Sequence, residues 1–107
     1  MLSLLGYPGT TTGLESGDRH TGYSMGENYP NPFRDKTTIS FGIPRTTYVS
    51  LKVRNILGTE IKELAGKIYT QGAHQVEFRS VGLPDGMYFY TLKADQFTQS
   101  LRMIYAP

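Results

Sequence analysis

The sequence predicts an all-β fold, an antiparallel β-sandwich of about seven strands with an extended N-terminal segment. Three observations lead to this prediction. Apolar and polar residues alternate over several short stretches, which is the period of a half-buried strand. Turn signals separate these stretches at about the 8–12 residues expected of a sandwich. The 107 residues include 8 Tyr, 5 Phe and 12 Gly, a composition that favours strands and tight turns.

Six stretches show strand periodicity. They cover residues 38–43, 48–54, 59–64, 73–79, 87–94 and 97–105. The stretch 59–64 is the weakest, and its Lys and Glu residues are typical of an edge strand. Gly58 predicts a tight connection, because glycine adopts positive φ at little cost, and residues 66–72 are expected to form a loop. A seventh strand is expected either from residues 28–33 or from the segment before them.

The alternating apolar faces of these strands predict one core. Its expected members are Ile39, Phe41, Val49, Leu51, Val53, Val76, Phe78, Tyr88, Tyr90, Leu92, Leu101 and Met103. The stretch 87–94 is apolar on both faces. It is therefore expected to be a central strand, covered on both sides or covered on one side by a partner.

The chain divides by composition into residues 1–27 and residues 28–107. Gly, Ser and Thr dominate the first part without any lasting period, which is typical of a linker or extended segment. Leu2, Leu4 and Leu5 are the apolar residues at its start. We expect them as assembly residues, because an extended segment can add a strand to the open sheet edge of a second copy. The chain is thus a candidate homo-oligomer.

Charge and composition exclude several functions. Eleven Lys and Arg stand against nine Asp and Glu, a net charge of +2 without a basic run, so no nucleic-acid partner is expected. There is no cysteine, and the two histidines, His20 and His74, are far apart and expected at the surface. No nucleophile elbow, phosphate loop or calcium loop occurs. We therefore expect no enzyme activity, no catalytic or metal-binding residue and no cofactor.

The stretch Leu83-Pro84-Asp85-Gly86-Met87-Tyr88-Phe89-Tyr90 matches a feature of immunoglobulin-like sandwiches. In those domains a Tyr near the start of a central strand bonds its hydroxyl to backbone a few residues upstream, and a core residue follows two positions later. Tyr88 takes the position of that tyrosine corner and Tyr90 the position of the core residue. An ordinary aromatic strand after a Pro-Asp-Gly turn is the alternative. Both interpretations keep the sandwich.

The order of the motifs resembles the type A C-terminal sorting domain of the type IX secretion system. Asn28-Tyr29-Pro30-Asn31-Pro32-Phe33 opens the set, the Asp85–Tyr90 stretch follows, and Ser100-Leu101-Arg102-Met103 ends it. The pattern also resembles the immunoglobulin-like domain of flagellar hook-capping proteins. The likeness implies a secreted or cell-surface protein of a Gram-negative bacterium, with the type IX machinery in the outer membrane as its partner. The secretion-motif candidates are Asn31, Pro32, Asp85, Gly86, Arg102, Met103 and Ile104.

The resemblance implies a non-catalytic sorting and anchoring role. Two alternatives stay open at this point. One is a structural subunit that assembles into a surface filament through the N-terminal segment. The other is a carbohydrate-binding sandwich, in which exposed aromatic residues of the 87–90 stretch would stack on sugar rings.

Overall fold

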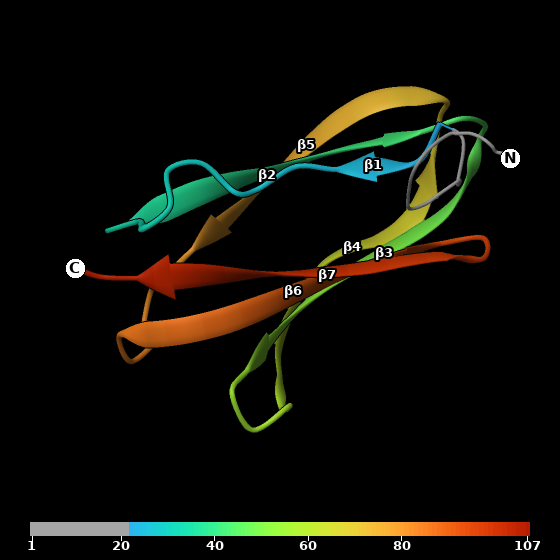
Figure 1. Ribbon diagram of the computed structural model, residues 1–107. Helices are drawn as coiled ribbons and strands as arrows, with labels where there is room; N and C mark the ends of the chain where they lie inside the picture. Colours follow the sequence, from blue (N-terminus) through green and yellow to red (C-terminus); the bar gives the residue numbers. More distant parts are fainter. Residues whose placement is uncertain (1–21) are drawn as a thin grey trace, which may run out of the picture.

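The structure, a computed structural model, describes residues 22–107. In this part of the chain seven strands form two antiparallel sheets that pack face to face (Figure 1). The strands are β1 (Ser24–Met25), β2 (Lys36–Ile43), β3 (Thr47–Asn55), β4 (Glu60–Tyr69), β5 (Gly72–Arg79), β6 (Gly86–Ala94) and β7 (Phe97–Tyr105). The predicted all-β sandwich is confirmed. Leu2, Leu4 and Leu5 lie outside the described residues.

The two sheets have the orders β1-β2-β5 and β4-β3-β6-β7. The β3–β4 and β6–β7 connections are hairpins within one sheet, whereas the chain crosses between the sheets after β2, β4 and β5. β2 ends at Ile43 because Pro44, the next residue, has no N–H to donate to a ladder. Gly58 has a φ of 85° in the β3–β4 turn, as the sequence predicted.

The predicted loop at residues 66–72 is wrong. β4 continues to Tyr69 and stays paired with β3 up to the pair Thr47–Tyr69, so the turn contains only residues 70 and 71. Main-chain pairing maintains β4 where its side chains alternate poorly. The strand is also irregular, since its register shifts twice against β3. β4 is an edge strand, as expected.

The short seventh strand comes from the segment before residue 28. β1 pairs with β2 through Ser24–Gly42 and Met25–Phe41, and Met25 is buried. The 28–33 stretch contributes isolated bridges instead, of Tyr29 with Thr38 and of Phe33 with Tyr105. Its prolines explain this, because they lack the N–H that a continuous ladder needs.

Most of the predicted core residues are buried, and two are only partly so. Val76 and Leu101 are half-buried because β5 and β7 are edge strands, where no neighbour covers the outer side. Phe33, Thr37 and Phe97 are also buried, although the sequence did not predict them as core residues. Phe33 lies outside the strands, whereas Thr37 and Phe97 are in phase with the buried positions of β2 and β7, at the start of each strand.

β6 is central in its sheet, but this chain covers only one of its faces. Tyr88, Tyr90 and Leu92 point into the core and are almost fully buried. Met87 and Phe89 point outward, and 36% of each is exposed. The predicted central position of this strand is confirmed, and the described residues leave its outer face uncovered.

Candidate functional site: the motif end of the sandwich

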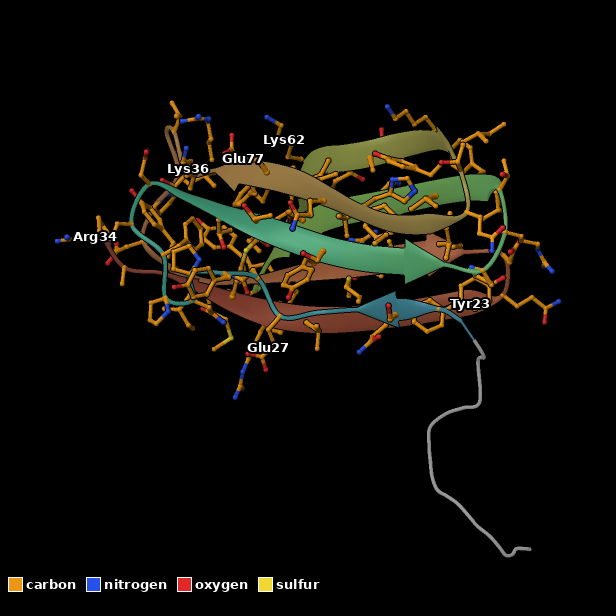
Figure 2. All side chains as sticks on the ribbon, turned by 90° about the horizontal axis from the view of Figure 1, so that it is seen from above. Tyr23, Glu27, Arg34, Lys36, Lys62 and Glu77 are labelled. Atoms are coloured by element: carbon orange, nitrogen blue, oxygen red, sulfur yellow. The ribbon has the colours of Figure 1, made fainter. Side chains whose placement is uncertain are left out.

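The segment between Tyr23 and Phe33 runs the length of the sandwich and joins the two sheets (Figures 1 and 2). At its middle, the buried Tyr90 hydroxyl accepts a hydrogen bond from the Asn28 backbone N–H at 2.8 Å and donates one to the Gly26 carbonyl at 3.1 Å. The Asn28 side chain donates to Thr37 Oγ1 at 3.0 Å. The first residue of the Asn-Tyr-Pro-Asn-Pro-Phe motif is therefore a buried polar anchor.

The last residues of the motif bind the C-terminal strand. Asn31 Oδ1 accepts a hydrogen bond from the Ile104 N–H at 3.0 Å. The Phe33 N–H donates to the Ile104 carbonyl, and the Ala106 N–H donates to the Phe33 carbonyl, both at 2.9 Å. Phe33 and Tyr105 form a parallel bridge, and their rings stack at 5.3 Å. Segments more than 70 residues apart are thereby joined.

The Asp85–Gly86 turn lies at the same end, next to the C-terminal strand (Figure 1). Gly86 begins β6 opposite Tyr105 and has a φ of 138°, a region that favours glycine. The Tyr88 hydroxyl donates to the Pro84 carbonyl at 2.6 Å, which is the geometry of a tyrosine corner. Burial raises the pKa of both Tyr88 and Tyr90 above the ordinary value of 10.0.

We call the surface formed by residues 29–33, 83–87 and 104–106 the motif end. It contains most of the secretion-motif candidates. Asn31, Pro32, Asp85 and Gly86 are exposed there, and Ile104 is half-buried. Met103 is fully buried in the core between the sheets, so it cannot touch a partner directly. Arg102 is exposed but points to the outer face of the sheet, paired with Phe89.

Several exposed apolar residues that were not predicted as site residues lie close to this end. A hollow of about 280 Å³ is lined mainly by Ile56, Ile61, Leu83, Pro84 and Met87. Ile56 and Leu57 are 69% and 84% exposed in the β3–β4 turn. The sequence contained a sign of this exposed apolar surface, because two large aliphatic residues in a tight turn have no packing role there.

The opposite end of the sandwich holds a polar cluster around Asp95 in the β6–β7 turn. Tyr23 donates a hydrogen bond to this carboxylate, Thr47 donates another at 2.8 Å, and Arg45 forms an ion pair at 3.2 Å. The hydrogen bonds from Tyr23 and Thr47 are the main causes that lower the pKa of Asp95 below its ordinary value. Tyr23 also stacks on Phe97, so the cluster fixes the start of the described chain.

Within residues 22–107 no group of three His, Cys, Asp or Glu side chains is placed to hold a metal ion. The His74 ring contacts the Thr70 carbonyl through Nε2 at 2.7 Å. No helix among the same residues is long and apolar enough to cross a membrane.

Two stacked antiparallel sheets, the tyrosine corner and the parallel bridge to the last strand define an immunoglobulin-like domain. A scan of family models gives a match to the secretion system C-terminal sorting domain over residues 27–106. The chain therefore belongs to this family, the sorting domains of the type IX secretion system. Searches of curated proteins and of solved structures gave no match.

The family membership gives the role of the domain. It is a non-catalytic sorting signal that interacts with the type IX secretion machinery. The protein is a secreted or cell-surface protein of a Gram-negative bacterium.

Proposed function

We propose that the motif end is the surface by which the type IX machinery recognises this sorting domain. One observation supports this most directly. Asn31 and Phe33 bind the main chain of Ile104 and Ala106, while Gly86 pairs with Tyr105, so three motifs distant in sequence meet on one surface. Such a surface exists only in the folded domain. The machinery would then distinguish the folded domain from unfolded chains.

In this proposal the candidates have different roles. Asn31, Pro32, Asp85 and Gly86 are exposed and available for contact. Ile104 presents its half-buried side chain beside them. Met103 acts through packing, because it is fully buried. Arg102 would form the border with the outer face of the sheet.

Export of a fluorescent protein fused before the full chain tests the proposal in a type IX-competent cell. Asp85→Asn and Arg102→Glu should reduce surface delivery while the purified variants keep the wild-type urea midpoint. Lys67→Glu is the matched control, because Lys67 is exposed on the edge strand β4 and lies opposite Val49, toward the other end of the sandwich. Normal export of a doubly substituted, folded variant would refute recognition through this end.

We infer further that the chain as a whole is not an enzyme, with residues 28–107 as the sorting unit and residues 1–27 as a connecting segment that also supplies β1 to the sandwich. The Asp, Glu and His residues described above serve turns, ion pairs and main-chain contacts. A fusion of residues 22–107 should deliver cargo as well as the full chain does. Loss of delivery on removing residues 1–21 would contradict this division.

Homo-oligomer formation through the N-terminal segment is a second proposal, supported by the edge of β7, which no strand among residues 22–107 covers beyond the bridge at Tyr105. The Ile104 N–H and carbonyl bond to Asn31 and Phe33, so they point away from β6. By strand alternation the main-chain groups of Thr98, Ser100 and Arg102 point the same way. A strand from a second copy could pair with them.

Light scattering of the full chain and of a chain lacking residues 1–21 tests this assembly. Assembly of the full chain that disappears with the deletion would support it. A full-length chain that stays monomeric at high concentration would refute it.

A further inference from the structure

The register of the four-stranded sheet gathers positive charge on its outer face. Lys52 and Arg54 on β3, Lys93 on β6 and Arg102 on β7 all alternate with buried residues of the core. We call these four residues and the surface between them the basic face. Across β3, β6 and β7 this face carries no Asp or Glu. On the neighbouring β4, Glu60 lies opposite Arg54 and forms an ion pair with Lys52 at 3.5 Å, and Glu63 lies opposite Lys52.

Three of the four cations have no ion pair within residues 22–107. Among the described residues, Arg54, Lys93 and Arg102 have no carboxylate within ion-pair distance. Like charges on adjacent strands repel each other, because neighbouring strands are only about 5 Å apart. An arrangement with this repulsion and without internal partners favours an anion from outside.

A small hollow in this face is lined by side chains that donate hydrogen bonds. It has a volume of about 30 Å³. Its lining consists of the cations Lys52, Arg54 and Lys93 and the hydroxyl residues Ser50 and Thr91. Cationic N–H groups and hydroxyls are the donors that carboxylate or phosphate oxygens accept, and charge-assisted bonds are the strong ones.

An exposed aromatic ring lies beside the hollow. Phe89 pairs with Arg54 on one side and with Arg102 on the other, so it stands between two guanidinium groups on the surface. It precedes Thr91, a lining residue, by two positions, which is about 7 Å along a strand. An aromatic face next to an anion subsite matches a sugar ring that carries an acidic group.

The surroundings favour a polysaccharide over a protein. Hydroxyls continue along the face, where Thr91 and Ser100 are hydrogen-bonded at 2.7 Å and Thr98 lies opposite Lys93. A protein interface needs a buried apolar centre with well-packed anchors. Between the four cations Phe89 is the single large apolar residue, and the exposed Met87 and Tyr48 lie outside them on the same face of the sheet. A flat, polar, cationic face with one ring is suited to a hydroxyl-rich chain.

We propose that the basic face binds an anionic polysaccharide, with an acidic group at the hollow between Lys52, Arg54 and Lys93 and a sugar ring on Phe89. This activity is additional to sorting and uses a different surface from the motif end. It would hold the domain at a glycan-covered cell surface without a covalent bond. Arg102 borders both surfaces, so the tests rely on Arg54 and Phe89.

Binding of the purified full chain to three immobilised polymers tests the proposal. Polygalacturonate carries a carboxylate on each sugar, poly-L-glutamate carries the same group on a peptide, and dextran is a neutral polysaccharide. We expect binding to polygalacturonate at low salt, weaker binding to poly-L-glutamate and none to dextran. Binding should be lost at about 1 M salt, where charges are screened beyond about 3 Å.

Substitutions distinguish the contribution of the positive charges to binding from the contribution of the Phe89 ring. Arg54→Gln with Lys93→Gln should weaken polygalacturonate binding by about tenfold or more. Phe89→Leu keeps the apolar bulk without the ring and should weaken binding to polygalacturonate but not to poly-L-glutamate. Lys62→Gln is the matched control. It removes one positive charge from β4 at a position that pairs with the inward-facing Val53, away from the basic face.

Each alternative result overturns the proposal. If the double substitution left polygalacturonate binding unchanged, the hollow would be excluded as the anion-binding site. Equal binding of poly-L-glutamate, with no effect of Phe89→Leu, would make the face a docking surface for acidic protein segments instead. Export of the Arg54→Gln, Lys93→Gln fusion should be normal, so that failure of glycan binding and failure of sorting give different results.

Discussion

Replacing Tyr90 with Phe tests how the first part of the sorting motif is held in place. Tyr90 is fully buried, and its hydroxyl serves both the Asn28 N–H and the Gly26 carbonyl. Phe fills the same volume, so no cavity forms, but the Asn28 N–H loses its partner. Asn28 is only 3% exposed, so water cannot replace that partner.

A buried donor without a partner costs about 1–3 kcal/mol. That is a large fraction of the roughly 5–15 kcal/mol by which a domain of this kind is stable. In a urea titration the midpoint should fall by roughly 1 M with an unchanged slope. Export of a fused cargo should fall with it, because the segment that leads to Asn31 loses its central attachment.

Tyr88→Phe is the matched control for this substitution. It removes the hydroxyl that bonds the Pro84 carbonyl, but Pro84 is exposed and water can hydrate the carbonyl. The expected cost is therefore smaller, about 0.5–1.5 kcal/mol. A Tyr90→Phe variant that is as stable as the wild type, or more stable than Tyr88→Phe, would refute the reasoning.

Further substitutions and pH changes test other parts of the structure. Leu51→Ala should cost about 2–5 kcal/mol in urea titrations, because Leu51 is fully buried between the sheets; a cost below about 1 kcal/mol would contradict its core position. Gly86→Ala should cost about 1–3 kcal/mol by the same measurement, because its positive φ is strained for alanine although space is open around it. Stability should fall as the pH rises past 10.0, since burial raises the pKa of Tyr90 in the folded state only, and Tyr90→Phe should make this fall shallower. The pKa of Asp95 is lowered in the folded state, so its effect on stability runs in the opposite direction. The stabilisation from the Asp95 carboxylate is present above the ordinary pKa of 3.8 and is lost as the pH falls through the lower pKa of the folded state. Asp95→Asn should therefore reduce the loss of stability at acid pH.

Local patterns determined much of the fold. Alternation placed Ile39, Leu51 and Val53 in the core, because the period of a strand assigns residues to faces regardless of which strand lies next to it. Turn chemistry placed Gly58 correctly, and the Pro-Asp-Gly-x-Tyr spacing placed the tyrosine corner, since both depend on residues close in sequence. The motif order identified the family, which the match over residues 27–106 confirmed.

The basic face and the motif end were decided by tertiary structure. Lys52, Arg54, Lys93 and Arg102 are spread over half of the chain, and the charge pattern showed no basic run. Only the pairing of β3 with β6 and of β6 with β7 brings them together on one surface. Likewise, nothing near Asn31 in the sequence indicates that its side chain binds the main chain at Ile104. Strand order and register arise from packing between residues far apart in sequence, so a linear pattern gives the face of each strand but not the neighbour across it.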